Sequence, residues 1–102
     1  MPVYVDNARI PFGPRRAFGQ RLLMCHMIAD SLDELHHMAS LCGLRQEWFQ
    51  EKASTPHYDL SLSKRDIAIR YGAVYVPTNR EVAALLKRLR ADRAEALAMI
   101  DG

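Results

Sequence analysis

Two histidines and three aspartates are the residues whose types and spacing best suit chemistry: Asp6, His26, Asp30, His57 and Asp59. Imidazole and carboxylate groups together suit zinc, manganese or iron, and a metal-activated water would make the site hydrolytic. The same groups could instead form an acid/base set without a metal. The sequence has no HExxH motif or similarly tight ligand spacing, so it does not identify a metal. We therefore treat His26, Asp30, His57 and Asp59 as candidate catalytic residues, Asp6 as a candidate ligand-binding residue, and a divalent metal as a candidate cofactor.

A second set of residues is suited to binding an anion such as phosphate. Four of them surround the expected start of a helix, where free N–H groups and the helix dipole favour negative charge. Two arginines lie in an upstream loop that could close over the same anion and contact it bidentately. Nucleotides and nucleic-acid backbones are the natural ligands of this kind. These candidate ligand-binding residues are Arg15, Arg16, Ser61, Ser63, Lys64 and Arg65.

Each candidate also has an explanation that involves no ligand. His26 could be a hydrogen-bonded core residue, and Asp30 could help to cap the helix that follows it. His57 and Asp59 could pair with each other or with the backbone. Ser63 could cap its own helix while the neighbouring cations are solvated. The sequence leaves these alternatives open.

The run of residues 22–30 is central to the placement of the candidates. It is largely apolar and predicts a strand buried on both faces. Ser31 and Glu34 have the spacing of a capping box, which predicts a helix directly after that strand. The helix is expected to run to Cys42 and to stop at Gly43. A strand that leads straight into a capped helix is a common place for ligands in α/β proteins.

Similar local patterns predict the remaining elements. We expect further strands at residues 3–5, 46–50 and 73–76, an irregular loop at residues 6–19, and helices that begin near Ser63 and Thr78. The helix from Ser63 is expected to end at Gly72, and the last helix to break near residues 91–93.

These elements follow one another as strand, strand, helix, strand, helix, strand, helix, which predicts an α/β fold. Because alternating units favour right-handed crossovers, we expect a small, mainly parallel four-stranded sheet with three helices, in a single domain spanning residues 1–102. In a parallel sheet the candidates at strand ends would gather at one edge. Such a sheet needs cover on both faces, so a homodimer is a second expectation.

Composition narrows the classes of function. The net charge of +2 requires no nucleic-acid or membrane partner, and 49% hydrophobic residues support a packed core. Cys25 and Cys42 stand in apolar patterns and predict buried free thiols rather than a disulfide. No apolar run approaches the ~20 residues of a membrane helix, and the first residues do not form a signal peptide. We therefore expect no membrane partner and a cytoplasmic location.

Residues 64–72 and the last helix together imitate a DNA-binding helix-turn-helix. Ala68 and Gly72 have the separation typical of its first helix. The strand-like residues 73–77 are long for its turn of roughly three to four residues. We therefore favour helix, strand and helix over this motif.

Seven short motifs stand out together: Val3-Tyr4-Val5-Asp6, Cys25-His26-Met27-Ile28-Ala29-Asp30, Glu34-Leu35, Trp48-Phe49-Gln50, His57-Tyr58-Asp59-Leu60-Ser61, Ser63-Lys64-Arg65 and Gly72-Ala73. In combination they resemble the bacterial and phage domain-of-unknown-function family numbered 4031. The resemblance spans residues 3–76, and only the loop at residues 14–20 looks longer than usual. It implies a prokaryotic or phage protein in the cytoplasm, and it supplies neither an activity nor catalytic residues.

The sequence favours a domain that binds a phosphate-bearing ligand, a nucleotide or a nucleic acid, at the strand ends near Asp30 and His57. The alternative is a metal-dependent hydrolase that uses the aspartates and histidines. A third hypothesis is an interaction factor without catalysis, in which Trp48, Phe49, Tyr58 and the last helix contact a protein partner.

Overall fold

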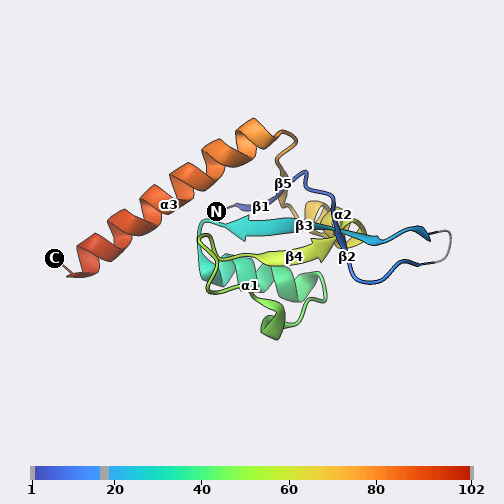
Figure 1. The fold of residues 1–102 in the computed structure, drawn as a ribbon. Helices are drawn as coiled ribbons and strands as arrows, with labels where there is room; N and C mark the ends of the chain where they lie inside the picture. Colours follow the sequence, from blue (N-terminus) through green and yellow to red (C-terminus); the bar gives the residue numbers. More distant parts are fainter. Residues whose placement is uncertain (1, 17–18, 102) are drawn as a thin grey trace.

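The computed structural model describes residues 2–16 and 19–101, and it contains a five-stranded sheet with three α-helices (Figure 1). The elements in chain order are β1 (Val3–Val5), β2 (Ile10–Phe12), β3 (Leu22–Ala29), α1 (Leu32–Leu41), the 3₁₀ helix η2 (Gln46–Trp48), β4 (Tyr58–Ser61), α2 (Leu62–Arg70), β5 (Val74–Tyr75) and α3 (Asn79–Asp101). The expected α/β class with three helices is therefore confirmed.

Strand β3 organises the sheet, because it pairs with three other strands. It binds β1 and β2 along one edge and β4 along the other, always antiparallel. Among the strands of the described residues, only β1 and β5 pair in parallel. The prediction of a mainly parallel, four-stranded sheet is therefore wrong, and the sheet is mixed. The order of elements along a chain does not fix strand direction, and here the connections return the chain beside β3 in the opposite sense.

Three local predictions failed, and the first is that no strand was expected where β4 forms. Residues 46–50 were expected to form a strand but contain η2, and only Gln50 makes a bridge, to His57. Strand β2 lies inside the stretch that was expected to be irregular. Its Pro11 has no N–H group to donate, which is tolerated in an edge strand such as this exposed one.

The sheet has two unlike faces. Helices α1 and α2 pack on one face over a core that includes Val5, Cys25, Met27 and Leu60, each at most 1% exposed. Because side chains alternate along a strand, His26 points to the other face. In Figure 1, α1 lies below the sheet and α3 lies on the opposite side, with its carboxyl-terminal part extending away from the body. Only the first part of α3 can therefore cover the face that carries His26.

The junction between β3 and α1 forms as predicted. The Ser31 hydroxyl accepts a hydrogen bond from the Glu34 amide at 3.3 Å and donates to its carboxylate at 2.9 Å, which is a capping box. Helix α1 has its carboxyl-terminal cap at Cys42, and Gly43 follows with a φ of 75°. That left-handed conformation favours glycine. Cys25 and Cys42 are buried free thiols, also as predicted.

The two later helices differ slightly from expectation. Ser61, rather than Ser63, caps α2 by accepting from the Lys64 amide at 3.3 Å. Thr78 and Glu81 form a capping box at the predicted start of α3, but α3 continues unbroken through residues 91–93. Strand β5 separates α2 from α3 and pairs with β1, so this region is not a helix-turn-helix. Within residues 2–16 and 19–101, no helix combines the length and apolar character needed to span a membrane.

Candidate metal centre

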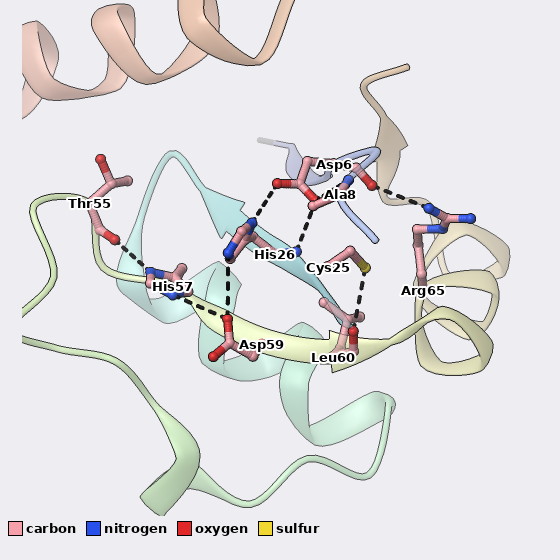
Figure 2. Close-up of polar contacts among 9 residues, drawn as sticks. All are labelled: Asp6, Ala8, Cys25, His26, Thr55, His57, Asp59, Leu60 and Arg65. Carbon is pink, nitrogen blue, oxygen red and sulfur yellow. Dashed lines mark hydrogen bonds and ion pairs between the residues drawn. The ribbon is translucent and has the colours of Figure 1, made fainter. Parts of the chain in front are cut away.

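Neighbouring strands place three of the predicted residues on one face of the sheet. His26 in β3 and Asp59 in β4 are directly opposed across the antiparallel pair. His57 precedes Asp59 by two residues and therefore projects from the same face. Figure 2 shows both imidazole rings beside the Asp59 carboxylate. The hydrogen-bond register of β3 and β4 thus assembles a cluster of two histidines and one aspartate.

Distances within this cluster suit a metal ion. Asp59 Oδ1 lies 3.3 Å from His57 Nε2 and 3.7 Å from His26 Nε2. One potential ligand atom from each of the three residues lies within 4.8 Å of the others. Ligand bonds of about 2.1 Å in a tetrahedral site place the ligand atoms roughly 3.4 Å apart. The three side chains could therefore bind one divalent ion after only small movements.

Both histidines are held so that Nε2 faces the cluster. His57 Nδ1 donates a hydrogen bond to the Thr55 carbonyl oxygen at 2.9 Å, because that oxygen can only accept. His26 Nδ1 lies 2.6 Å from the Asp6 carboxylate. In each ring the proton at Nδ1 leaves the Nε2 lone pair available for a metal. Carbonyl or carboxylate partners behind the ring are typical of metal-binding histidines.

Asp6 is itself fixed by the backbone. Its Oδ1 accepts from the amide of His26 at 2.9 Å and from the amide of Ala8 at 3.1 Å, which leaves Oδ2 for the His26 ring. Burial alone would raise the pKa of the Asp6 carboxyl, but hydrogen bonds from the His26 ring, the His26 amide and Ala8 lower that pKa below its usual value. Asp6 is therefore a stable carboxylate that orients His26 from behind.

The hydrogen bond with Asp6 also changes the pKa of His26. Its hydrogen bond with Asp6 raises the pKa of the imidazole above the ordinary value, against the opposing effect of burial, and the charges of Asp6 and Asp59 add to the rise. In the metal-free protein His26 is thus more basic than a free imidazole. A metal at Nε2 would have to displace a proton from this ring as pH falls.

A cavity of about 180 Å³ adjoins the cluster. Its polar part contains Asp6, His26 and His57, and its apolar part comes from the sheet and from the start of α3. The apolar residues include Tyr4, Ile28, Val76, Val82, Leu85 and Leu86. A pocket of this kind can hold part of a small molecule beside the histidines.

Asp30 lies apart from the cluster, although the sequence placed it there. Its carboxylate accepts from Arg88 Nη2 at 3.2 Å, and Arg88 also contacts Asp92 and Tyr4. Asp30 follows His26 by four residues, which corresponds to roughly 13 Å along a strand. It lines a second cavity, of about 320 Å³. The structure therefore brings together Asp6, His26, His57 and Asp59 but not Asp30.

The residues of the predicted anion site are also dispersed. Ser61 caps α2, and Ser63 contacts the Ser61 hydroxyl at 3.1 Å. Arg65 donates to the Asp6 carbonyl at 3.4 Å and lies over the Tyr75 ring. Arg15 donates to the Gly19 carbonyl at 2.8 Å. Arg15 and its neighbour Arg16 belong to the β2–β3 hairpin, which extends away from the body of the sheet (Figure 1).

Sequence reasoning missed two residues beside the cluster. The sequence singled out neither Thr55 nor Arg90 as a candidate. Arg90 Nε donates to Thr55 Oγ1 at 2.9 Å, across a separation of 35 residues. No local pattern could have indicated that contact. His57 and Asp59, in contrast, were singled out for their chemistry, although the strand β4 that places them on one face was not predicted.

Comparisons with known proteins identify a family but no activity. No curated protein and no solved structure matches the chain. The family described as "Protein of unknown function (DUF4031)" matches residues 3–89, which is most of the chain and confirms the resemblance found in its motifs. This chain therefore belongs to the DUF4031 family.

Proposed function

We propose that this protein is a metal-dependent hydrolase whose divalent ion is bound by His26, His57 and Asp59. One observation carries the proposal: two imidazoles, each oriented by a partner behind it, direct Nε2 toward the same carboxylate oxygen. Metal-binding histidines usually have such partners behind the ring. The hydrolase hypothesis thus has more geometric support than the anion site at the start of α2.

The donor set indicates which ions would fit. Two imidazole nitrogens and one carboxylate suit zinc, manganese or iron better than magnesium or calcium. Three protein ligands leave at least one coordination position open, as in catalytic rather than structural zinc sites. When bound, such an ion would polarise a substrate oxygen and lower the pKa of a water ligand.

The chain's own residues would do the remaining work. Asp6 orients His26 and strengthens it as a donor through the Nδ1 contact. The Thr55 carbonyl fixes the tautomer of His57. The apolar wall of the cavity, formed in part by Leu85 and Leu86, would hold the substrate body against the open side of the cluster. Binding and orientation of the substrate would then account for part of the rate.

Metal titration of purified, chelator-treated protein tests the proposal. We expect one equivalent of zinc to bind, and the substitutions His57→Ala and Asp59→Asn each to weaken that binding at least 100-fold. His37→Ala is the matched control, because His37 is an exposed histidine on α1 outside the cluster. Zinc-dependent hydrolysis should then be sought with a panel of phosphate and carboxylate esters.

Two results would contradict the proposal. The first is zinc binding that responds equally to His57→Ala and His37→Ala, because the cluster would then not be the site. The second is selective binding of iron(II) with oxygen consumption, because two histidines and one carboxylate also serve iron oxygenases. A protein that binds no metal, yet loses ester hydrolysis in Asp6→Asn, would instead use Asp6 and His26 as an acid/base pair.

A further inference from the structure

Arg90 is a cation beside the cluster whose side chain donates to two hydroxyl groups. Its Nε donates to Thr55 Oγ1 at 2.9 Å and its Nη2 donates to Ser54 Oγ at 3.1 Å. Both acceptors are neutral hydroxyls. Among residues 2–16 and 19–100, no carboxylate forms an ion pair with it. The charge of this guanidinium is therefore positioned but not neutralised.

A neighbour on the same helix shows the contrast. Arg88 contacts the carboxylates of Asp30 and Asp92, both at 3.2 Å, so its charge is already matched within the protein. Arg90 has instead been drawn toward the loop that precedes β4. A guanidinium whose protein contacts are neutral hydroxyls keeps its positive charge for an external anion.

The location of Arg90 connects it to the candidate metal centre. Ser54, Thr55 and Arg90 line both the 180 Å³ cavity and the 320 Å³ cavity, so these two spaces adjoin at Arg90. Thr55 accepts from Arg90 through its side chain and from His57 through its carbonyl oxygen. Figure 2 shows the Thr55 carbonyl directed toward the His57 ring while α3 passes above. One residue therefore separates the guanidinium from a ligand of the proposed metal.

The unused N–H groups of Arg90 suit an oxyanion, such as a phosphate or a carboxylate. Two of the five guanidinium N–H groups are engaged by Thr55 and Ser54. Three remain, including a pair on the two terminal nitrogens that can bind two oxygens side by side. Phosphate presents oxygens at this spacing and carries a negative charge that would neutralise the Arg90 guanidinium. Arg93 lines the larger cavity as well and would add a second cation, while the carboxylates of Asp30 and Asp92 in the same lining are paired with Arg88.

We propose that Arg90 binds the phosphate group of the substrate, so that the protein acts on a phosphate-bearing molecule. This inference rests on the proposed hydrolase function for the role of the cluster, but the phosphate contact itself requires only Arg90. The apolar wall formed by Val82, Leu85 and Leu86 would accept the organic part, and the two cavities together have the size of a small-molecule site. A nucleotide-sized phosphate ester and the terminal phosphate of a nucleic-acid strand share this chemistry.

Calorimetric titration with phenyl phosphate tests the contact in both metal-free and zinc-loaded protein. We expect Arg90→Gln to weaken binding of phenyl phosphate about 10-fold or more, because a charge-assisted contact is lost. Lys87→Ala removes an exposed cation of the same helix that lines neither cavity and should have little effect. A 5′-phosphorylated tetranucleotide distinguishes the two sources: tighter binding than phenyl phosphate, with a steep salt dependence, identifies a nucleic-acid substrate.

A second variant separates phosphate binding from support of the loop. Thr55→Val removes the hydroxyl that accepts from Arg90 but keeps the carbonyl that accepts from His57. If Arg90 binds phosphate directly, Thr55→Val retains most of the affinity for phenyl phosphate while Arg90→Gln does not. Equal affinity for phenyl phosphate in Arg90→Gln and the unmodified protein overturns the inference. That result would not contradict the proposal that zinc binds to His26, His57 and Asp59. Arg90-dependent binding of phenyl phosphate without any zinc binding would contradict the hydrolase proposal alone.

Discussion

The two faces of strands β3 and β4 are built from alternate residues of the same short segments, yet they serve different ends. Cys25, Met27 and Leu60 on one face are fully buried beneath α1 and α2. His26 and Asp59 on the other face remain partly open, with side chains 34% and 43% exposed. The first face contributes apolar burial, and the second holds polar groups in fixed positions. The alternation of side chains along a strand thus places the apolar core residues on one face and the ionisable cluster on the other.

The closed face should dominate stability, and adjacent residues of β4 provide the test. Leu60→Ala leaves a cavity among buried side chains and should lower the free energy of unfolding by about 2–5 kcal/mol. Asp59→Ala, one residue earlier, should change it by less than about 1 kcal/mol in metal-free protein. Urea unfolding of both variants measures the difference. Equal losses would show that the open face is part of the core.

The open face should dominate metal binding, even through a residue that is not a ligand. Asp6→Asn removes the carboxylate behind His26 but keeps an oxygen for the amides of His26 and Ala8. We expect zinc affinity to fall about 10- to 100-fold, because loss of such a partner loosens the ligand. Asp66→Asn makes the same charge change at an exposed position of α2 and should have no effect. Unchanged zinc affinity in Asp6→Asn would remove Asp6 from the site.

The sequence predicted the junction of β3 and α1 because every signal there is local. The apolar run, the Ser31–Glu34 capping box and Gly43 all act within a few residues of their own position. His57 and Asp59 differ, because the sequence singled them out only for their chemistry and predicted no strand where β4 forms. Their position on one face of that strand became clear only from its pairing with β3.

The remainder depended on contacts between distant segments. The directions of β1 and β4 beside β3 are settled by long-range pairing, so a parallel sheet was expected and a mixed one formed. Arg90 contacts Ser54 and Thr55, which precede it by more than 30 residues, and no local sequence pattern near Arg90 predicts that contact. Asp30 was misplaced for the same reason, because its partner Arg88 lies 58 residues away.

The open face should also make the stability of the protein depend on pH, through His26 and Asp6. The raised pKa of His26 means that its contribution to stability is fully present below pH 6.5, the pKa of an unperturbed histidine, and is lost as pH rises through its higher folded value. The lowered pKa of Asp6 acts in the opposite sense: its contribution is present above pH 3.8 and is lost as pH falls through the lower folded value. Metal-free protein should therefore gain most from this pair at mildly acidic pH.

Bound zinc should reverse the way stability changes with pH near the folded pKa of His26. A metal requires the neutral imidazole, so the stabilisation that zinc confers should increase as pH rises through the folded pKa of His26. Thermal unfolding of metal-free and zinc-loaded protein between pH 5 and pH 8 measures both slopes, with His26→Gln as the reference. Parallel slopes in the two forms would mean that zinc does not bind through His26.

The smallest effect should come from Asp30, which resembles Asp6 in sequence but not in surroundings. Both aspartates stand at strand ends, yet Asp6 faces His26 whereas Asp30 faces the exposed Arg88. Surface ion pairs contribute little to stability, because solvent screens them. We expect Asp30→Asn to leave zinc affinity within about 2-fold of the original value, while Asp59→Asn abolishes tight binding. Loss of zinc in Asp30→Asn would mean that α3 shifts to admit Asp30 as a ligand, and that the cluster of three residues is incomplete without it.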